Sequence, residues 1–404
     1  MAITKQPVLN IGLAGHVDHG KTTLLWQLTG KWSDTHSEEL KRGITIKLGY
    51  ADAIIKRCVD CGILTSKDKC KCGGKAEPVK YVSFVDVPGH EMLMATMLSG
   101  AAIIDAALLV IAANEGIKPQ TKEHLAALDA KGIKEIIIVQ NKIDLVSKEQ
   151  ALKNYNDIKN FVKGSVAENS PIIPISAQQG ANMEILLEAI DKIPIPKRDV
   201  ESKPLFFIAR SFDTNRPGTS ADDIIGGVLG GVLKQGRLKV GDVIEIKPGM
   251  VVKKHNITEY VTVKTKIAAM QTGNNKIEEA EPSGSLAIQT ELDPGLTKAD
   301  SLSGCVAALQ GTLPEITKNA KLKVSLFKEI LGLDKAETVT PIKMNEPLLL
   351  SINTAITVGI VTKIKGNEIE LGLKIPIIPL KGSKAGIGRN LAGHWRLIGW
   401  GEII

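Results

Sequence analysis

Aromatic side chains are scarce in this sequence, at 3% of 404 residues, and there are only five cysteines. So few aromatics disfavour base stacking as a means of binding nucleic acid, which would then be recognised by its backbone and shape. Four of the five cysteines lie between Cys58 and Cys72. This clustering argues against the disulfide framework of a small secreted protein and indicates a metal site instead.

Signals for export or membrane insertion are also missing. The first seven residues, Met-Ala-Ile-Thr-Lys-Gln-Pro, include no apolar signal region. The longest apolar stretch, Met92–Ala113, is interrupted by Ser99, Gly100 and Asp105. We interpret it as a buried helical piece followed by a strand and not as a membrane span. A cytoplasmic protein without a membrane partner is therefore expected.

Length and charge set further limits. A chain of 404 residues is too long for one ordinary core, so two or three domains are expected. The formal net charge is +7, and residues 318–404, with 13 Lys+Arg against 7 Asp+Glu, contribute +6 of it. This asymmetry favours an anionic partner for the last segment, although a solvated basic surface explains it equally well.

Two patterns of hydrophobic residues divide the chain. From residue 8 to about 195, apolar runs alternate with amphipathic stretches, which predicts an α/β domain with a mostly parallel sheet. Beyond the proline-rich segment Ile193–Asp199, short alternating runs such as Gly226–Gly249 are separated by Gly and Pro, which predicts two small β-barrel domains. We place the domains at residues 1–198, 203–315 and 318–404.

The stretch Gly15–Thr22 fits the phosphate-binding pattern G-x-x-x-x-G-K-[ST], directly between an expected strand and an expected helix. In such a loop the backbone N–H groups point at phosphates, and the helix N-terminus adds a favourable dipole. Lys21 is expected to reach the β- and γ-phosphates, and the Thr22 hydroxyl to bind Mg²⁺. The predicted nucleotide contacts of the loop are Asp18, His19, Gly20, Lys21, Thr22 and Thr23.

Three further motifs follow later strands and complete a guanine-nucleotide site. Asp86-Val-Pro-Gly89 offers an aspartate that holds Mg²⁺ through water and a glycine N–H for the γ-phosphate. The Asp144 carboxylate in Asn141-Lys142-Ile143-Asp144 can accept hydrogen bonds from N1 and the 2-amino group of guanine, which selects GTP over ATP because adenine lacks that amino group. The base pocket is expected to close with Ser176, Ala177 and Gln178.

This set of motifs resembles the translational GTPases, whose first switch has the same Arg-Gly-Ile-Thr-Ile sequence as Arg42–Ile46. From the residues alone, that pentapeptide is equally well a strand start. The resemblance implies that Thr45 binds Mg²⁺ when a γ-phosphate is present, and that His90 positions the attacking water. It also implies that Val17 and Ile44 form an apolar gate that holds this histidine back.

Asp18 is an unusual residue for a phosphate loop, because a carboxylate repels phosphate unless a cation lies between them. We therefore hypothesise that Asp18, together with the carbonyl of Gly43, holds a second Mg²⁺ that takes part in catalysis.

The cysteine cluster lies in a hydrophilic insert at about residues 56–76. Cys58-x-x-Cys61 and Cys70-x-Cys72 supply four thiols to a Gly- and Lys-rich loop that has no core of its own. Four thiolates around Zn²⁺ would stabilise such a loop, although the Cys-x-Cys spacing is unusual. A reduced or oxidisable loop without metal is the alternative.

Along nearly its whole length the chain resembles the gamma subunits of archaeal and eukaryotic translation initiation factor two. The resemblance rests on the phosphate loop, the cysteine insert, Arg210–Gly218, the Gly-Gly-Val run from Gly226 and the closing His394–Gly401. It implies alpha and beta partner subunits and delivery of methionylated initiator tRNA to the small ribosomal subunit, with release after GTP hydrolysis. Two alternatives are a selenocysteine-specific elongation factor and a GTPase subunit of a metabolic enzyme such as sulfate adenylyltransferase.

Overall fold

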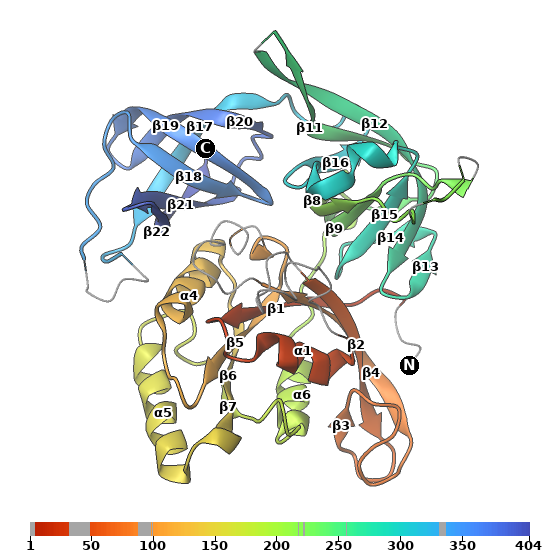
Figure 1. Cartoon of the computed structure of the whole chain (residues 1–404), viewed down its shortest axis with the longest axis vertical. Coiled ribbons are helices and arrows are strands. Elements are labelled where there is room, and N and C mark those ends of the chain that lie inside the picture. The colour runs from red at the N-terminus through yellow and green to blue at the C-terminus, as the bar shows by residue number, and fades with distance from the viewer. Residues whose placement is uncertain are drawn as a thin grey trace. The chain divides into compact units, whose positions relative to one another are not determined.

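The computed structural model describes residues 5–31, 49–87, 98, 100–216, 218–220, 223–255, 257–330 and 337–404. The N-terminal part is an α/β domain around a seven-stranded sheet with the strand order β3-β2-β4-β1-β5-β6-β7 (Figure 1). Its strands are β1 (Leu9–Gly15), β2 (Gly49–Cys58), β3 (Leu64–Thr65), β4 (Ala76–Asp86), β5 (Ala106–Ala112), β6 (Glu135–Asn141) and β7 (Ile172–Pro174). Its helices are α1 (Lys21–Thr29), α4 (Pro119–Lys131), η2 (Ile143–Leu145), α5 (Lys148–Phe161) and α6 (Met183–Lys192).

Five neighbouring strands of this sheet, β4, β1, β5, β6 and β7, are parallel. Every residue of β1 and of β5 is buried, as expected for strands covered on both faces. On one face, leucines of α1 and α6 pack against Leu9, Ile11 and Leu13 of β1. The carboxyl ends of these parallel strands lie along a common edge, which is where ligands bind in such sheets.

Next to β4, on the side away from β1, an antiparallel hairpin extends the sheet. The strand β2 pairs antiparallel with β4 from Gly49↔Asp86 to Cys58↔Ala76. The cysteine insert is therefore not a loop throughout, because Lys56–Cys58 and Ala76–Pro78 are paired strand residues. The side chain of Leu64 on β3 is buried in the same core as α1 and α6, so the insert is anchored to the domain.

The next part of the chain forms a β-barrel. Its ring runs β11-β16-β8-β9-β15-β12 and closes by pairing of β11 with β12, with β13 added beside β12 and a separate β10–β14 pair. The strands are β8 (Leu205–Phe212), β9 (Val228–Gln235), β10 (Leu238–Lys239), β11 (Val243–Lys254), β12 (Ile257–Thr272), β13 (Asn275–Ile277), β14 (Glu279–Ala280), β15 (Leu286–Thr290) and β16 (Val306–Leu309); η4 (Pro294–Leu296) and η5 (Lys298–Asp300) are short 3₁₀ helices.

A second barrel closes the chain in the order β17-β20-β19-β18-β21-β22. Its strands are β17 (Thr317–Leu326), β18 (Pro347–Ile352), β19 (Ala355–Lys365), β20 (Glu368–Ile377), β21 (Lys384–Leu391) and β22 (His394–Ile403). On β17, buried Ala320, Leu322 and Val324 alternate with exposed lysines, which is the period-2 pattern read from the sequence.

The predicted fold class is confirmed: an α/β domain with a mostly parallel sheet is followed by two small β-barrels. The domain limits 1–198, 203–315 and 318–404 stay a prediction. Within the described ranges, no helix is both long enough and apolar enough to cross a bilayer.

Candidate functional site

The phosphate loop joins β1 to α1 at the carboxyl edge of the sheet, and two of its glycines are required by its shape. Gly15 has φ 141°, and a Cβ there would lie 2.3 Å from the carbonyl oxygen of Val110. Gly20 has φ 87°, and a Cβ there would lie 2.4 Å from the side-chain nitrogen of Asn141. Side chains at these positions would both clash and strain the backbone, so the glycines fix the path of the loop.

Lys21 and Thr22 open the first turn of α1. The Lys21 ammonium is buried and donates hydrogen bonds to the carbonyl oxygens of Gly15 at 3.0 Å and His16 at 2.7 Å. The Thr22 hydroxyl donates to a carboxylate oxygen of Asp86 at 3.1 Å, although the two residues are 64 positions apart. Hydroxyl and carboxylate oxygens are the ligands that Mg²⁺ prefers, so these two side chains suit that ion. The structure thus brings two predicted magnesium residues together.

Asn141, at the end of β6, connects three loops of the site. Its side-chain nitrogen donates to the carbonyl oxygen of His19 at 2.9 Å, and its side-chain oxygen accepts from the backbone N–H of Ala177 at 3.0 Å. Asp144 follows in η2 and is exposed. The phosphate loop, the segment that begins at Asn141 and the Ser176–Gln178 loop are therefore joined through Asn141 at the carboxyl edge of the sheet.

His19 has a buried side chain and a backbone carbonyl oxygen that accepts the hydrogen bond from Asn141. Its imidazole is fully buried, with Nδ1 3.2 Å from the carbonyl oxygen of Val110 on β5. Burial lowers the pKa of His19 to about 3, against the hydrogen bond to Val110, which raises it, and with smaller lowering effects of His16, Lys21 and Lys142. A neutral ring cannot supply positive charge to a phosphate, so a nucleotide contact of His19 would have to come from its backbone N–H, which here makes a long hydrogen bond of 3.5 Å to the carbonyl oxygen of His16.

Sequence reasoning missed Glu115, which lies beyond the carboxyl end of β5. One carboxylate oxygen lies 3.3 Å from the ammonium of Lys142, the lysine of the guanine-specific motif, and the other lies 3.9 Å from that of Lys118. The position of Glu115 in the sequence could have identified it. Ligands bind at the carboxyl ends of parallel strands, and no motif had been assigned to the carboxyl end of the central strand β5.

Several predicted residues lie outside the described part of the chain: Gly43, Ile44, Thr45, Gly89 and His90. Asp18, which is predicted to hold a second Mg²⁺, lies within the described part. Its side chain is exposed and its φ is 61°, a left-handed conformation that aspartate tolerates better than most residues.

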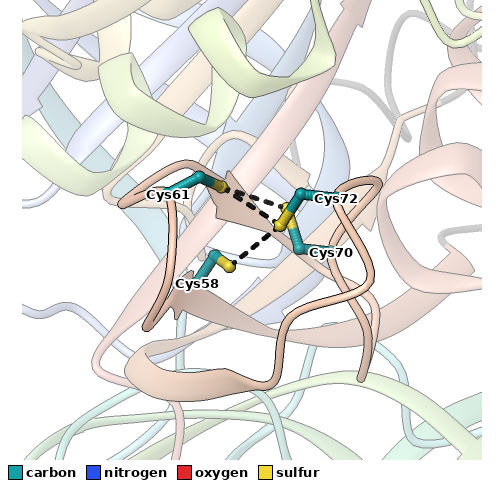
Figure 2. A group of neighbouring side chains, drawn as sticks. All are labelled: Cys58, Cys61, Cys70 and Cys72. Atoms are coloured by element: carbon teal, nitrogen blue, oxygen red, sulfur yellow. Dashed lines mark hydrogen bonds between the residues drawn. The ribbon is translucent and has the colours of Figure 1, made fainter.

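The four clustered cysteines lie with their sulfur atoms facing one another at the end of the β2–β4 hairpin (Figure 2). All four sulfur atoms lie within 4.8 Å of one another, and three pairs, Cys58–Cys72, Cys61–Cys70 and Cys61–Cys72, are 3.5 Å apart. Tetrahedral zinc with Zn–S bonds of about 2.3 Å requires sulfur separations of about 3.8 Å. The Cys-x-Cys spacing therefore does not prevent all four thiols from converging, and the cluster is compatible with zinc.

Local hydrogen bonding favours the thiolate at one of these positions. The backbone N–H of Cys61 lowers the pKa of the Cys58 thiol to about 7, in opposition to burial, which raises it. Thiolates are the metal-binding form of cysteine, but the pKa values of Cys61 and Cys72 are raised, in part by neighbouring sulfur atoms, so without a cation the surroundings favour a thiolate at Cys58 and not throughout the cluster.

Comparison with known proteins agrees with this geometry. The family described as "Elongation factor Tu GTP binding domain" matches residues 6–195, and "Initiation factor eIF2 gamma, C terminal" matches residues 318–403. Translation initiation factor 2 subunit gamma of Methanococcus maripaludis is 52% identical over 100% of both chains. The protein of that name from Pyrococcus furiosus is 52% identical over 99% of this chain and 98% of its own.

Two solved structures share the fold. A bacterial selenocysteine-specific elongation factor has a TM-score of 0.76 at 25% identity; the match covers 99% of this chain but only 58% of the length of the other. Elongation factor SelB of Methanococcus maripaludis, crystallised with the GTP analogue GppNHp, has a TM-score of 0.71 at 23% identity over 100% of this chain and 80% of its own. Sequence identity to the initiation-factor subunits is about twice as high. The chain therefore belongs to the translation initiation factor 2 gamma family of GTP-binding, GTP-hydrolysing translation factors.

Proposed function

We propose that this chain is the GTP-dependent subunit that binds methionylated initiator tRNA and delivers it to the small ribosomal subunit, with release after GTP hydrolysis. It would work in the cytoplasm with the alpha and beta subunits of the same factor. The observation that carries the proposal is the meeting of the phosphate loop, Asp86 and Asn141 at one sheet edge, in a chain 52% identical over its full length to initiation factor 2 gamma subunits.

The experiment that tests this role compares four ligands: initiator methionyl-tRNA, elongator methionyl-tRNA, uncharged initiator tRNA and selenocysteinyl-tRNA. Binding is measured with a GTP analogue bound and the alpha subunit present. Selective binding of the charged initiator is expected. Selective binding of selenocysteinyl-tRNA would instead favour the elongation-factor alternative, and binding of no tRNA at all would leave a metabolic GTPase as the better account.

We assign the binding of GTP and GDP to residues of the phosphate loop and of the three later motifs. The proposed contacts are Asp18, His19, Gly20, Lys21, Thr22, Thr23, Asp86, Gly89, Asn141, Lys142, Asp144, Ser176, Ala177 and Gln178. The first Mg²⁺ is assigned to Thr22 and Thr45, with Asp86 acting through water, and would neutralise charge on the β- and γ-phosphates. The contact between Thr22 and Asp86 supports this assignment.

His90 is assigned the positioning of the attacking water. Replacing His90 with Ala is expected to lower the single-turnover rate of GTP hydrolysis by about 100-fold, because correctly placed acid–base and polar groups contribute at least that much. GDP affinity is the control and is expected to stay unchanged. An unchanged hydrolysis rate in a properly folded variant would remove His90 from the catalytic set.

Asp18 and the Gly43 carbonyl are assigned a second Mg²⁺. Asp18→Asn is the matched variant, because asparagine keeps the size of the side chain and tolerates φ 61° while removing the charge. We expect its hydrolysis rate to fall at least about tenfold, because the lost ion no longer stabilises transition-state charge. The measurement is single-turnover hydrolysis over a magnesium titration, and a wild-type magnesium dependence would contradict the second site.

Zn²⁺ is assigned to Cys58, Cys61, Cys70 and Cys72, where it would close the end of the β2–β4 hairpin. The convergence of the four sulfur atoms supports this assignment. The insert is joined to α6 by polar contacts as well, with Arg57 3.4 Å from Asp191 and Lys71 4.0 Å from Glu184. Such exposed ion pairs contribute little, so beyond the paired strand residues and buried Leu64 the order of the insert would come mainly from the metal.

A further inference from the structure

The backbone of Gly15 is held on both sides. Its N–H donates a hydrogen bond of 2.8 Å to Nδ1 of His124, and its carbonyl oxygen accepts the bond of 3.0 Å from the Lys21 ammonium. The carbonyl oxygen of Val110 lies 2.3 Å from the position that a Cβ of residue 15 would take. Gly15 is the last residue of β1 and the first of the phosphate loop, so these contacts determine the direction in which the loop leaves the sheet.

His124 comes from α4, 109 residues away in the sequence. Its ring is 3% exposed, and its helix neighbours Leu125 and Leu128 are buried as well. Burial, with a smaller effect of the Lys21 charge, lowers the pKa of His124 to about 3, so the ring is neutral at physiological pH. A neutral imidazole accepts at one nitrogen only, and acceptance at Nδ1 requires the proton to be on Nε2.

A buried backbone N–H without an acceptor is costly, and His124 supplies the acceptor for Gly15. A packing role alone would need only a side chain of similar volume at position 124. The hydrogen bond adds a requirement for an acceptor atom at the δ position, directed at the start of the phosphate loop.

We propose that His124 is a positioning residue for GTP and GDP binding, which fixes the Gly15 peptide so that the following N–H groups and Lys21 face the phosphates. This inference rests on the proposed GTP-dependent function. It predicts that nucleotide affinity depends on the acceptor at position 124 more than on the volume of the side chain.

Two substitutions separate these requirements. In His124→Asn, the side-chain oxygen is bonded to Cγ, as Nδ1 is in histidine, so the variant keeps an acceptor at that position. His124→Leu has a side chain of comparable volume and no acceptor. The dissociation constant and dissociation rate of a fluorescent GDP are measured on the full chain, with the melting temperature of each variant. We expect at least about tenfold weaker binding for the Leu variant, and binding within about threefold of wild type for the Asn variant.

Equal weakening in both variants, or wild-type affinity in the Leu variant, would overturn the positioning role. If circular dichroism shows the Leu variant to be unfolded, His124→Met takes its place, because a flexible thioether fits the site without a strong acceptor. A wild-type chain that binds neither GDP nor GTP would overturn the proposed function together with this inference. If the wild-type chain binds tightly and the Leu and Met variants bind equally tightly, only the inference about His124 would be overturned.

Discussion

Replacing Asp144 with Asn is expected to lower the affinity for GDP and GTP at least about 100-fold, because a site built to accept two hydrogen bonds from guanine then presents one acceptor and one donor. Xanthine carries an oxygen in place of the 2-amino group, which matches the asparagine amide. The variant should therefore bind xanthosine diphosphate more tightly than GDP. Asp144 is exposed in η2, so the substitution leaves the core unaltered.

Competition between GDP and xanthosine diphosphate, for the wild-type chain and for the variant, measures this switch. Asp157→Asn is the matched control, since Asp157 is an exposed carboxylate on the neighbouring helix α5 and is expected to change nothing. An Asp144→Asn chain that keeps its preference for GDP would show that the base is recognised elsewhere.

Removing metal from the cysteine cluster is expected to have the second large effect. The four thiols converge in an insert rich in trypsin sites, including Arg57, Lys67 and Lys75. A structural zinc supplies most of the folding energy of such a small unit, so a chelator should raise the rate of tryptic cleavage within residues 57–75 at least about tenfold. GDP affinity should be retained, because the nucleotide site is built from other strand ends.

The same increase in cleavage is expected without chelator for Cys72→Ser, which removes one ligand. Lys67→Ser, an exposed substitution in the same insert, is the control and should behave as wild type once the loss of its own cleavage site is taken into account. Stoichiometric metal analysis completes the measurement. A chain that contains no zinc and resists trypsin equally with and without chelator would contradict the assignment.

The fold and the general position of the site could be predicted because both depend on local pattern. Continuous apolar runs such as Ala106–Ala112 are characteristic of buried parallel strands. Short runs separated by glycines are characteristic of small β-barrels. Parallel strands bring their carboxyl ends to one edge, so the phosphate loop and the Asn141 motif were expected to meet there without any knowledge of the connecting helices.

Contacts between distant segments were not predictable in the same way. The bond between Gly15 and His124 joins residues 109 positions apart, and the bond between Asn141 and His19 joins residues 122 apart. A histidine on an apolar helix face is usually read as packing, and only the packed structure reveals what its nitrogen contacts. Likewise the pairing of Lys56–Cys58 with Ala76–Pro78 was not expected, because a hydrophilic, Gly- and Lys-rich composition indicates a loop.

We expect the bound nucleotide to control the binding of initiator tRNA. The most direct measurement is the dissociation constant of methionylated initiator tRNA for the chain with its alpha subunit, once with a GTP analogue and once with GDP. A GTP switch predicts binding at least about tenfold tighter in the GTP-analogue form, which corresponds to a coupling free energy of about 1.4 kcal/mol. Equal affinity in both forms would contradict the account, because the nucleotide would then have no influence on the tRNA.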